Sequence, residues 1–191
     1  ALQATLDRLV ARHESLRTHF VAKGGVPYQQ IAPADCGFAL RHEDCSEADV
    51  ARVAAEEAAA EFDLSTGPLI RGRLLKIAAN EHVLLITQHH IVSDGWSINV
   101  LVREVAALYT AFRRGEADPL PPLELQYADY AQWQRQWLQG DELTRQSDFW
   151  KDHLTGVPAL LSLPLDRPRP VVQSHAGGRI TLKLSPELTA N

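Results

Sequence analysis

Two adjacent histidines, His89 and His90, follow an apolar, β-rich segment at residues 83–88. Because successive residues of a strand point to opposite faces of a sheet, the two imidazoles cannot share one role. One should face a packed interior and the other an open space. Imidazole is the side chain that exchanges a proton near neutral pH. The pattern therefore predicts one reactive imidazole at a strand end, with Asp94, four residues after His90, fixing the local geometry.

The elements that must position these residues are strands before them and a helix after them. Residues 69–78 and 82–90 have β character and are expected to pair antiparallel. From about Ser97 an apolar stripe recurs at helical spacing, and Gly115 is the expected end of that helix. The histidines should therefore lie between the last strand and a long helix.

The rest of the chain mixes helical and strand patterns. Helical periodicity covers residues 2–18, 47–62, 127–138 and 141–154. Strand patterns cover residues 19–21, 26–31, 38–42 and 179–184, with a Gly-Gly turn between the first two. Three prolines between residues 161 and 173 indicate an extended connection. The sum predicts an α/β (α+β) fold with a mixed β-sheet flanked by helices.

Composition excludes several classes of function. The 191 residues carry a formal net charge of −5 with both signs mixed along the chain, and no basic stripe suggests nucleic-acid binding. No apolar run reaches the length of a membrane span, and no secretory signal opens the chain. Cys36 and Cys45 form no metal-type cluster and are expected as free thiols. We expect a soluble, cytoplasmic protein without a metal site.

Both ends of the sequence suggest a fragment of something larger. Residue 1 falls within a helical pattern and has no cap before it. Ser185 and Pro186 read as the N-cap and first position of a helix, only a few residues before the chain stops.

Three blocks of residues, in order along the chain, carry a resemblance to a known family. Residues 12–20 (RHESLRTHF) resemble an RHExLRTxF block, residues 89–97 (HHIVSDGWS) resemble HHxxxDGxS, and residues 127–133 (YADYAQW) resemble YxDYAxW. A proline-rich stretch follows at residues 163–170. The chain is therefore similar to the condensation domains of non-ribosomal peptide synthetases.

The resemblance implies a fold and a division of the chain. Such domains have two lobes, each similar to chloramphenicol acetyltransferase, and are about twice the size of this chain. Residues 1–175 would be the N-terminal lobe. Residues 176–191 would be a crossover strand and a helix start that lead to the missing C-terminal lobe.

The resemblance also implies a reaction and its partners. A donor acyl thioester and an acceptor aminoacyl thioester would be joined by a peptide bond, each held on the phosphopantetheine arm of a peptidyl carrier protein. No cofactor would bind the chain directly. An adenylation domain would belong to the same assembly line. A piece that lacks the second lobe is expected to be inactive alone.

Roles for single residues follow from the resemblance. His90 would be the catalytic histidine, orienting the acceptor amine and managing its proton. The N–H of Gly95 could bind the oxyanion, and Gly95 lets the backbone approach the reacting carbonyl. Asp94 would pair with an arginine, either Arg17 or one from the missing lobe, and so hold the loop. His89 would pack and hydrogen-bond under the strand.

Other functions compete with this interpretation. A non-catalytic docking module of the same fold would usually have a damaged histidine motif, and here it is intact. An acyltransferase that uses free coenzyme A is opposed by the RHExLRTxF block. An epimerising relative would tend to have Ser-Trp after the aspartate, whereas here the order is Gly95-Trp96-Ser97. Four aromatic residues at helical spacing are expected to be core rather than ligand contacts: Tyr127, Tyr130, Trp133 and Trp137.

Overall fold

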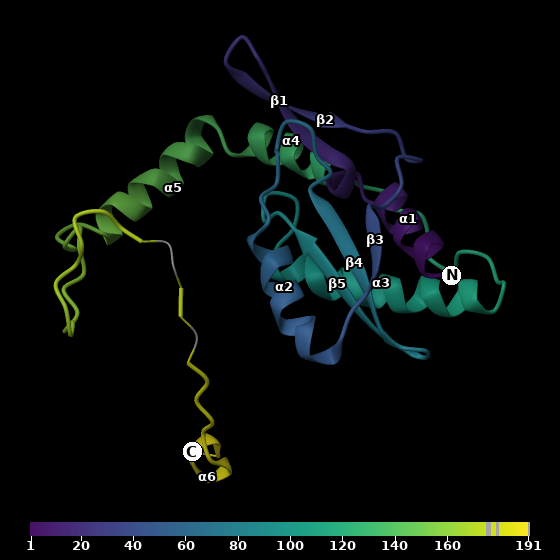
Figure 1. Ribbon diagram of the computed structural model, residues 1–191. Coiled ribbons are helices and arrows are strands. Elements are labelled where there is room, and N and C mark those ends of the chain that lie inside the picture. The colour runs from purple at the N-terminus through teal and green to yellow at the C-terminus, as the bar shows by residue number, and fades with distance from the viewer. Residues whose placement is uncertain (175–176, 179, 191) are drawn as a thin grey trace. The chain divides into compact units, whose positions relative to one another are not determined.

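The computed structural model describes residues 1–174, 177–178 and 180–190 (Figure 1). The chain divides into two units, Ala1–Leu143 and Thr144–Asn191. All strands of the described residues lie in the first unit, together with the residues of the histidine motif.

A three-stranded mixed sheet leads into the histidine motif. Its strands are β3 (Leu40–Asp44), β4 (Ile70–Ala78) and β5 (Glu81–Gln88), in the order β3-β4-β5. β3 runs parallel to β4, and β4 runs antiparallel to β5, with Ile70 opposite Gln88. The expected antiparallel pair and the expected mixed sheet are both confirmed.

A separate two-stranded hairpin precedes this sheet. β1 (Thr18–Lys23) and β2 (Val26–Ile31) pair antiparallel through a turn at Gly24 and Gly25. Both glycines have positive φ, 59° and 80°, as a two-residue turn that matches strand twist requires. The Gly-Gly signal in the sequence therefore predicted this hairpin correctly.

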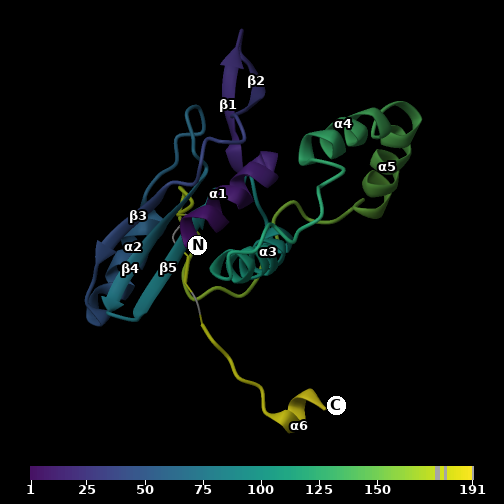
Figure 2. The same ribbon diagram turned by 90° about the vertical axis from the view of Figure 1, so that its right-hand side faces the viewer.

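Helices cover both faces of the sheet. α1 (Leu2–Arg12) and α3 (Gly95–Arg113) pack together on one face, and α2 (Val50–Ala59) lies on the other (Figure 2). The face below α1 and α3 holds the main core: Leu6, Leu9, Val10, Leu16, Phe38 and Ile70, with Leu101, Val105 and Ile86 packed against it. Apolar side chains at helical spacing on α1 and α3 account for this contact.

The expected helix over residues 2–18 is wrong beyond Arg12. His13 is extended, a 3-10 turn spans Glu14–Arg17, and β1 starts at Thr18. The break is held by a side chain distant in sequence, because Gln126 donates to the carbonyl of Arg12 and accepts from the N–H of Glu14. Helical periodicity could not reveal this contact.

Smaller differences occur at other boundaries. The expected strand at 38–42 is found at Leu40–Asp44, because Phe38 is buried in the core instead. A 3-10 turn (Glu47–Asp49) precedes α2, which ends at Ala59, and α3 starts at Gly95 rather than at 97. The helices expected at 127–138 and 141–154 are confirmed as α4 (Tyr127–Trp137) and α5 (Gly140–His153).

The C-terminal stretch differs from expectation in one element. Residues 161–173 lack regular structure, as predicted. Residues 180–184 form no strand, so that expectation is wrong there, and Arg179 lies outside the described residues. α6 (Pro186–Thr189) does begin with a Ser185 cap, whose hydroxyl accepts from Leu188. The domain boundary expected between residues 175 and 176 also lies outside the described residues and stays a prediction.

Candidate active site

His89 continues the pairing of the sheet just beyond the end of β5. Its N–H donates to the carbonyl of Leu69 (2.9 Å), and its imidazole Nδ1 accepts from the N–H of Ile91 (3.0 Å). The half-buried ring meets Phe62 edge-on, with 6.0 Å between centroids. His89 is thus held on the α2 side of the sheet by one backbone bond, one side-chain bond and one ring contact.

An ion cluster formed by Glu57, Arg71 and Arg73 packs against Phe62. The Arg71 guanidinium lies 3.9 Å from the centre of the Phe62 ring and donates to Glu57 (2.6 Å). Arg73 contacts the other carboxylate oxygen of Glu57 (2.7 Å), and Glu57 is only 4% exposed. This cluster links α2 to β4 and, through Phe62, to His89.

The charges in this cluster set the ionisation of Glu57. Burial alone raises the pKa of the Glu57 carboxyl, but the hydrogen bonds and positive charges of Arg71 and Arg73 outweigh it and leave the pKa lowered. Sequence analysis did not identify this cluster. The available signal was two arginines on one face of a buried strand, which require an acidic partner.

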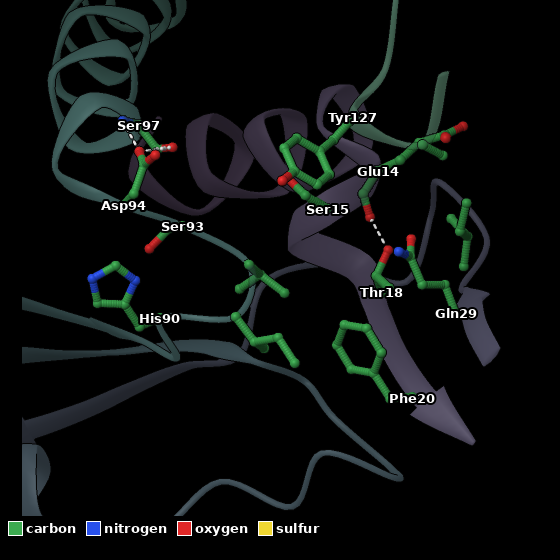
Figure 3. Close-up of a pocket in the computed structure, with 14 residues that line it drawn as sticks. Glu14, Ser15, Thr18, Phe20, Gln29, His90, Ser93, Asp94, Ser97 and Tyr127 are labelled. Atoms are coloured by element: carbon green, nitrogen blue, oxygen red, sulfur yellow. Dashed lines mark hydrogen bonds between the residues drawn. The ribbon is translucent and has the colours of Figure 1, made fainter. Parts of the chain in front are cut away.

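His90 is exposed and lines an open pocket of about 160 Å³ (Figure 3). His90 and Ser93 come from the loop after β5, and Phe20 and Gln29 on the opposite wall come from the hairpin. The two neighbouring histidines therefore lie in different surroundings, one packed and one open, as strand alternation predicts.

Asp94 is the N-cap of α3. Its carboxylate accepts from the backbone N–H of Ser97 (2.8 Å) and from the Ser97 hydroxyl (2.7 Å). These bonds hold the pKa of Asp94 below its usual value, and the nearby charge of His90 adds to the effect. The carboxylate fixes the turn by capping the helix.

Of the two arginines expected as partners of Asp94, Arg17 does not pair with it, and one from the missing lobe stays a prediction. The Arg17 guanidinium donates to the carbonyl of Ala32 and contacts Glu14 (3.4 Å). Ala32 directly follows β2, the second strand of the hairpin, and Glu14 begins the 3-10 turn that Arg17 ends. Arg17 thus fastens the hairpin to the 3-10 turn, and Asp94 finds its donors on its own helix.

Gly95 is the first residue of α3 and is exposed beside the pocket. A Cβ built on Gly95 would meet no atom within 4 Å, and its φ is not positive. Neither packing nor backbone conformation therefore requires glycine at this position. As the first N–H of a helix, the Gly95 N–H has no intrahelical acceptor and lies at the positive end of the helix dipole.

A second cavity of about 340 Å³ adjoins the His90 pocket. Its lining is mainly apolar and comes from α1, α3 and the segment before α4, including Leu9, Trp96 and Leu125. Ser15, Ser93, Ser97 and Tyr127 border both cavities, and all four are visible around the His90 pocket in Figure 3.

The residues of the first block, 12–20, fasten helices together. Glu104 of α3 contacts Arg12 (3.2 Å) and His13 (2.6 Å) at the end of α1. Arg12 is 8% exposed and also donates to the carbonyl of Pro121. Sequence analysis identified Arg12 and His13 in the block but missed Glu104, whose position on α3 carried no distinguishing signal.

The four aromatic residues of α4 are not core residues. Tyr127, Tyr130, Trp133 and Trp137 are 47–62% exposed. Successive rings contact one another at 5.6–5.8 Å between centroids. The expectation that they are buried is wrong, because helical spacing places them on one face but cannot tell what covers that face.

Among the described residues, no group of three or more His, Cys, Asp or Glu side chains is arranged to hold a metal ion. Cys36 and Cys45 are free thiols, as expected. Within the described part of the chain no helix combines the length and apolar character needed to cross a membrane.

Comparisons with known proteins give matches over nearly the whole chain. The family model described as the condensation domain matches residues 1–191. The chain is 46% identical to malpinin synthetase from Mortierella alpina over 99% of its length. It is 40% identical to the phosphinothricin tripeptide synthetase PhsC from Streptomyces viridochromogenes, also over 99% of its length. It spans only 2% and 18% of these two relatives, respectively.

Solved structures agree with this match. The X-domain from teicoplanin biosynthesis superimposes with a TM-score of 0.80 and 37% identity, over 90% of this chain and 39% of that one. The first condensation domain of the calcium-dependent antibiotic synthetase, solved with a substrate analogue, gives a TM-score of 0.70 and 26% identity, over 82% of this chain and 39% of that one. The expected fold class, a chloramphenicol-acetyltransferase-like α/β lobe, is confirmed.

Proposed function

The chain belongs to the condensation-domain family, and we propose that, within a peptide synthetase, it forms the peptide bond between two carrier-bound substrates. The donor is an acyl thioester and the acceptor an aminoacyl thioester. Each arrives on the phosphopantetheine arm of a peptidyl carrier protein, and an adenylation domain of the same cytoplasmic assembly line supplies the activated amino acid. The acceptor nitrogen attacks the donor carbonyl, and the carrier thiolate leaves.

The observation that carries this proposal is the exposure of His90 in an open pocket. An α-amino group has an ordinary pKa of about 8, so about a tenth of the acceptor amine is neutral at pH 7 and can attack without a strong base. His90 therefore acts chiefly by orienting the amine and taking up the proton that the attack releases. Orientation of two reactants alone can lower a barrier by about 7–11 kcal/mol.

The start of α3 supplies the second catalytic element. The tetrahedral intermediate carries a negative oxygen, and the free N–H of Gly95 at the helix N-terminus is suited to donate to it. Asp94 and His89 do not touch the substrates in this scheme. They hold the loop, Asp94 by capping α3 and His89 by packing on Phe62.

A second function is favoured by one finding. The X-domain of teicoplanin biosynthesis, 36% identical to this chain, was also solved in complex with the protein OxyB. A chain of this fold could likewise serve as a docking module that holds a partner protein. The intact histidine motif favours the enzyme, since docking alone does not need an exposed imidazole.

Replacement of His90 tests the proposal. In the full-length synthetase, His90→Ala should lower transfer of the donor onto the acceptor carrier by about 100-fold or more. Because His90 is exposed, carrier binding and thermal unfolding should not change. Transfer is measured as the mass of the acyl chain on the acceptor carrier, and binding by titration with loaded carrier protein.

The matched control is His82→Ala, at an exposed histidine on β5 away from the pocket, which should transfer normally. Unchanged transfer by the His90 variant would remove this residue from the mechanism. Tight binding of a non-carrier protein by a chain that transfers nothing would support the docking function instead.

A further inference from the structure

The loop that carries His90 is fixed on both sides of this residue by its neighbour, His89. The N–H of His89 donates to the carbonyl of Leu69 at 2.9 Å, and the carbonyl of His89 accepts from the N–H of Val92 at 3.1 Å. A third bond uses the ring, because the imidazole Nδ1 of His89 accepts from the N–H of Ile91 at 3.0 Å. The two main-chain bonds need no particular side chain at position 89, so only the third depends on how the His89 ring is turned.

The orientation of the His89 ring is set by its contact with Phe62. The two ring centroids are 6.0 Å apart and the ring planes are 89° apart, which is an edge-to-face arrangement. Such a contact favours one orientation, because the positive edge of one ring meets the negative face of the other. Rotation of the His89 side chain to another rotamer would lose this contact and move Nδ1 away from the N–H of Ile91.

Phe62 is itself held in place by Arg71, although it lies in a segment without regular structure that follows α2. The Arg71 guanidinium donates to three main-chain carbonyls at the end of this helix, those of residues 57 (3.2 Å), 60 (2.6 Å) and 61 (3.1 Å). The last carbonyls of a helix lack intrahelical donors and lie at the negative end of the helix dipole, so a cation is favoured there. The same guanidinium lies 3.9 Å from the centre of the Phe62 ring. Arg71 therefore fixes both the backbone that carries Phe62 and one face of its ring.

These contacts form one connected series from β4 to the loop of the reactive histidine. Arg71 holds Phe62, Phe62 orients the His89 ring, and that ring bonds the residue after His90. Arg71, Phe62 and His89 do not line the His90 pocket, so they can affect a reaction there only through the placement of His90.

We propose that Phe62 is a positioning residue for His90, because its ring keeps the Nδ1 of His89 directed at the N–H of Ile91, and that Arg71 holds Phe62 for this purpose. This inference rests on the proposed amide-forming function and deepens it. Misplacement of a reacting group by about 1 Å can lower a rate on the order of 100-fold, so a loosened loop slows the chemical step rather than the binding of carriers. An edge-to-face ring contact favours its orientation by a factor of about 2 to 12.

Phe62→Leu tests the ring contact, because leucine keeps an apolar side chain and removes the aromatic ring. In the full-length synthetase we expect the transfer rate at saturating loaded carriers to fall about 2- to 12-fold, with KM for each carrier unchanged. Hydrogen exchange followed by mass spectrometry should be faster at Ile91 in the same variant, because the bond from its N–H to His89 is weakened.

The matched control is Val53→Ala, at a buried position of α2. This variant should lower the unfolding temperature, because it removes buried apolar atoms, but should change neither the transfer rate nor the exchange at Ile91. Equal losses of transfer in Val53→Ala and Phe62→Leu would reduce the effect to general destabilisation and overturn the proposal.

A double substitution shows whether Phe62 acts through His89. The side-chain oxygen of asparagine is as many bonds from the backbone as Nδ1 of histidine, so His89→Asn can still accept from the N–H of Ile91, whereas His89→Leu cannot. We expect His89→Asn to transfer about 2- to 12-fold faster than His89→Leu. Adding Phe62→Leu to His89→Asn should cost less than about 2-fold more, because the ring that Phe62 orients is no longer present.

Each remaining outcome decides against the proposal. Transfer and exchange at wild-type levels in Phe62→Leu would show that the ring contact does not position the loop. Equal losses from Phe62→Leu in the wild type and in His89→Asn would show that Phe62 acts by another route. If Phe62→Leu did not fold, equal rates of His89→Asn and His89→Leu would still overturn the proposal. Failure of the amide-forming function itself would appear differently, as no transfer by the wild type.

Discussion

Residue by residue, the motif separates groups that face the pocket from groups that support it. His90 and Asp94 line the pocket and Gly95 is exposed beside it, but the Asp94 carboxylate is engaged in capping α3, and the half-buried His89 ring accepts from the N–H of Ile91. Gly95 is the most informative of these, since neither its φ nor its neighbours require glycine. The proposed function gives a reason for glycine at this position, because the absence of a side chain lets a substrate approach the backbone closely.

Gly95→Ala tests whether glycine is needed at this position for the fold or for the approach of a substrate. We expect the folded protein to be as stable as the wild type, because the added methyl group meets no atom within 4 Å. Transfer should fall by about 10- to 100-fold, since the methyl group displaces the reacting carbonyl from the helix N-terminus. Rates of peptide transfer and thermal unfolding are the measurements.

Gly72→Ala is the contrasting control. There a Cβ would lie 2.9 Å from a ring carbon of Phe38 and 3.0 Å from the carbonyl oxygen of Leu85, so this variant should lose stability. An alanine at position 95 that transfers at the wild-type rate would show that no substrate approaches the backbone there.

At the scale of elements, β4 connects the site to the rest of the sheet. Its two arginines, Arg71 and Arg73, share the carboxylate of Glu57 on α2, and Arg71 lies against Phe62, which contacts His89. On its other face, Gly72 allows Phe38 to pack closely. One face of β4 thus contributes Arg71 and Arg73 to the ion cluster, and the other face packs against the apolar core.

Glu57→Gln should destabilise the protein by about 2–4 kcal/mol, because Arg71 loses its carboxylate partner and Arg73 keeps only the longer contact with Glu43, at 3.5 Å. Glu56→Gln is the matched control on the same helix. Its side chain is 52% exposed and, within the described part of the chain, forms an ion pair with Arg52 alone, so its loss should cost less than about 1 kcal/mol. Denaturant unfolding measures both, and equal effects would contradict the role given to the cluster.

Glu57→Gln should also change how the stability of the protein depends on pH. The pKa of Glu57 is lowered in the folded protein, so the carboxylate stabilises the fold above the ordinary glutamate pKa of about 4.3. That contribution is lost as the pH falls through the folded-state pKa, because the unfolded chain binds the proton first. Stability of Glu57→Gln should therefore fall less steeply below about pH 4.3 than that of the wild type.

At the scale of the whole molecule, this chain corresponds to part of a larger architecture. It spans 39% of the X-domain structure and 39% of the condensation domain solved with a substrate analogue. The His90 pocket is open in the chain described here, and its walls come from one loop, the hairpin and the segments beside them. A reaction between two tethered substrates needs both to be held in line.

The 191-residue chain alone should therefore show no measurable peptide transfer, even with both carriers loaded. Adding the remainder of the family domain, as part of the same polypeptide, should restore transfer. Mass analysis of the acceptor carrier checks both. Turnover by the chain alone at a rate near that of the complete domain would mean that these residues supply the whole catalytic site.

The sequence by itself determined the local features of this protein. Apolar, β-rich segments predicted β4 and β5, helical periodicity predicted α3, and the Gly-Gly pair predicted the hairpin turn. Strand alternation separated the two histidines, and the three motif blocks identified the family. The strands, the helix and the turn depend on residues that are near one another in the chain, so their signals appear in a single sequence, whereas the parallel pairing that makes the sheet mixed joins Leu40 to Gly72.

Only the tertiary structure decided the long-range contacts. The end of α1 at Arg12 depends on Gln126, Arg71 pairs with Glu57 of α2, and Arg17 donates to the carbonyl of Ala32 in addition to its contact with the nearby Glu14. The exposure of the α4 aromatics depends on what packs against that face. Such contacts join segments far apart in sequence, and periodicity reports which face a residue occupies but not what covers that face.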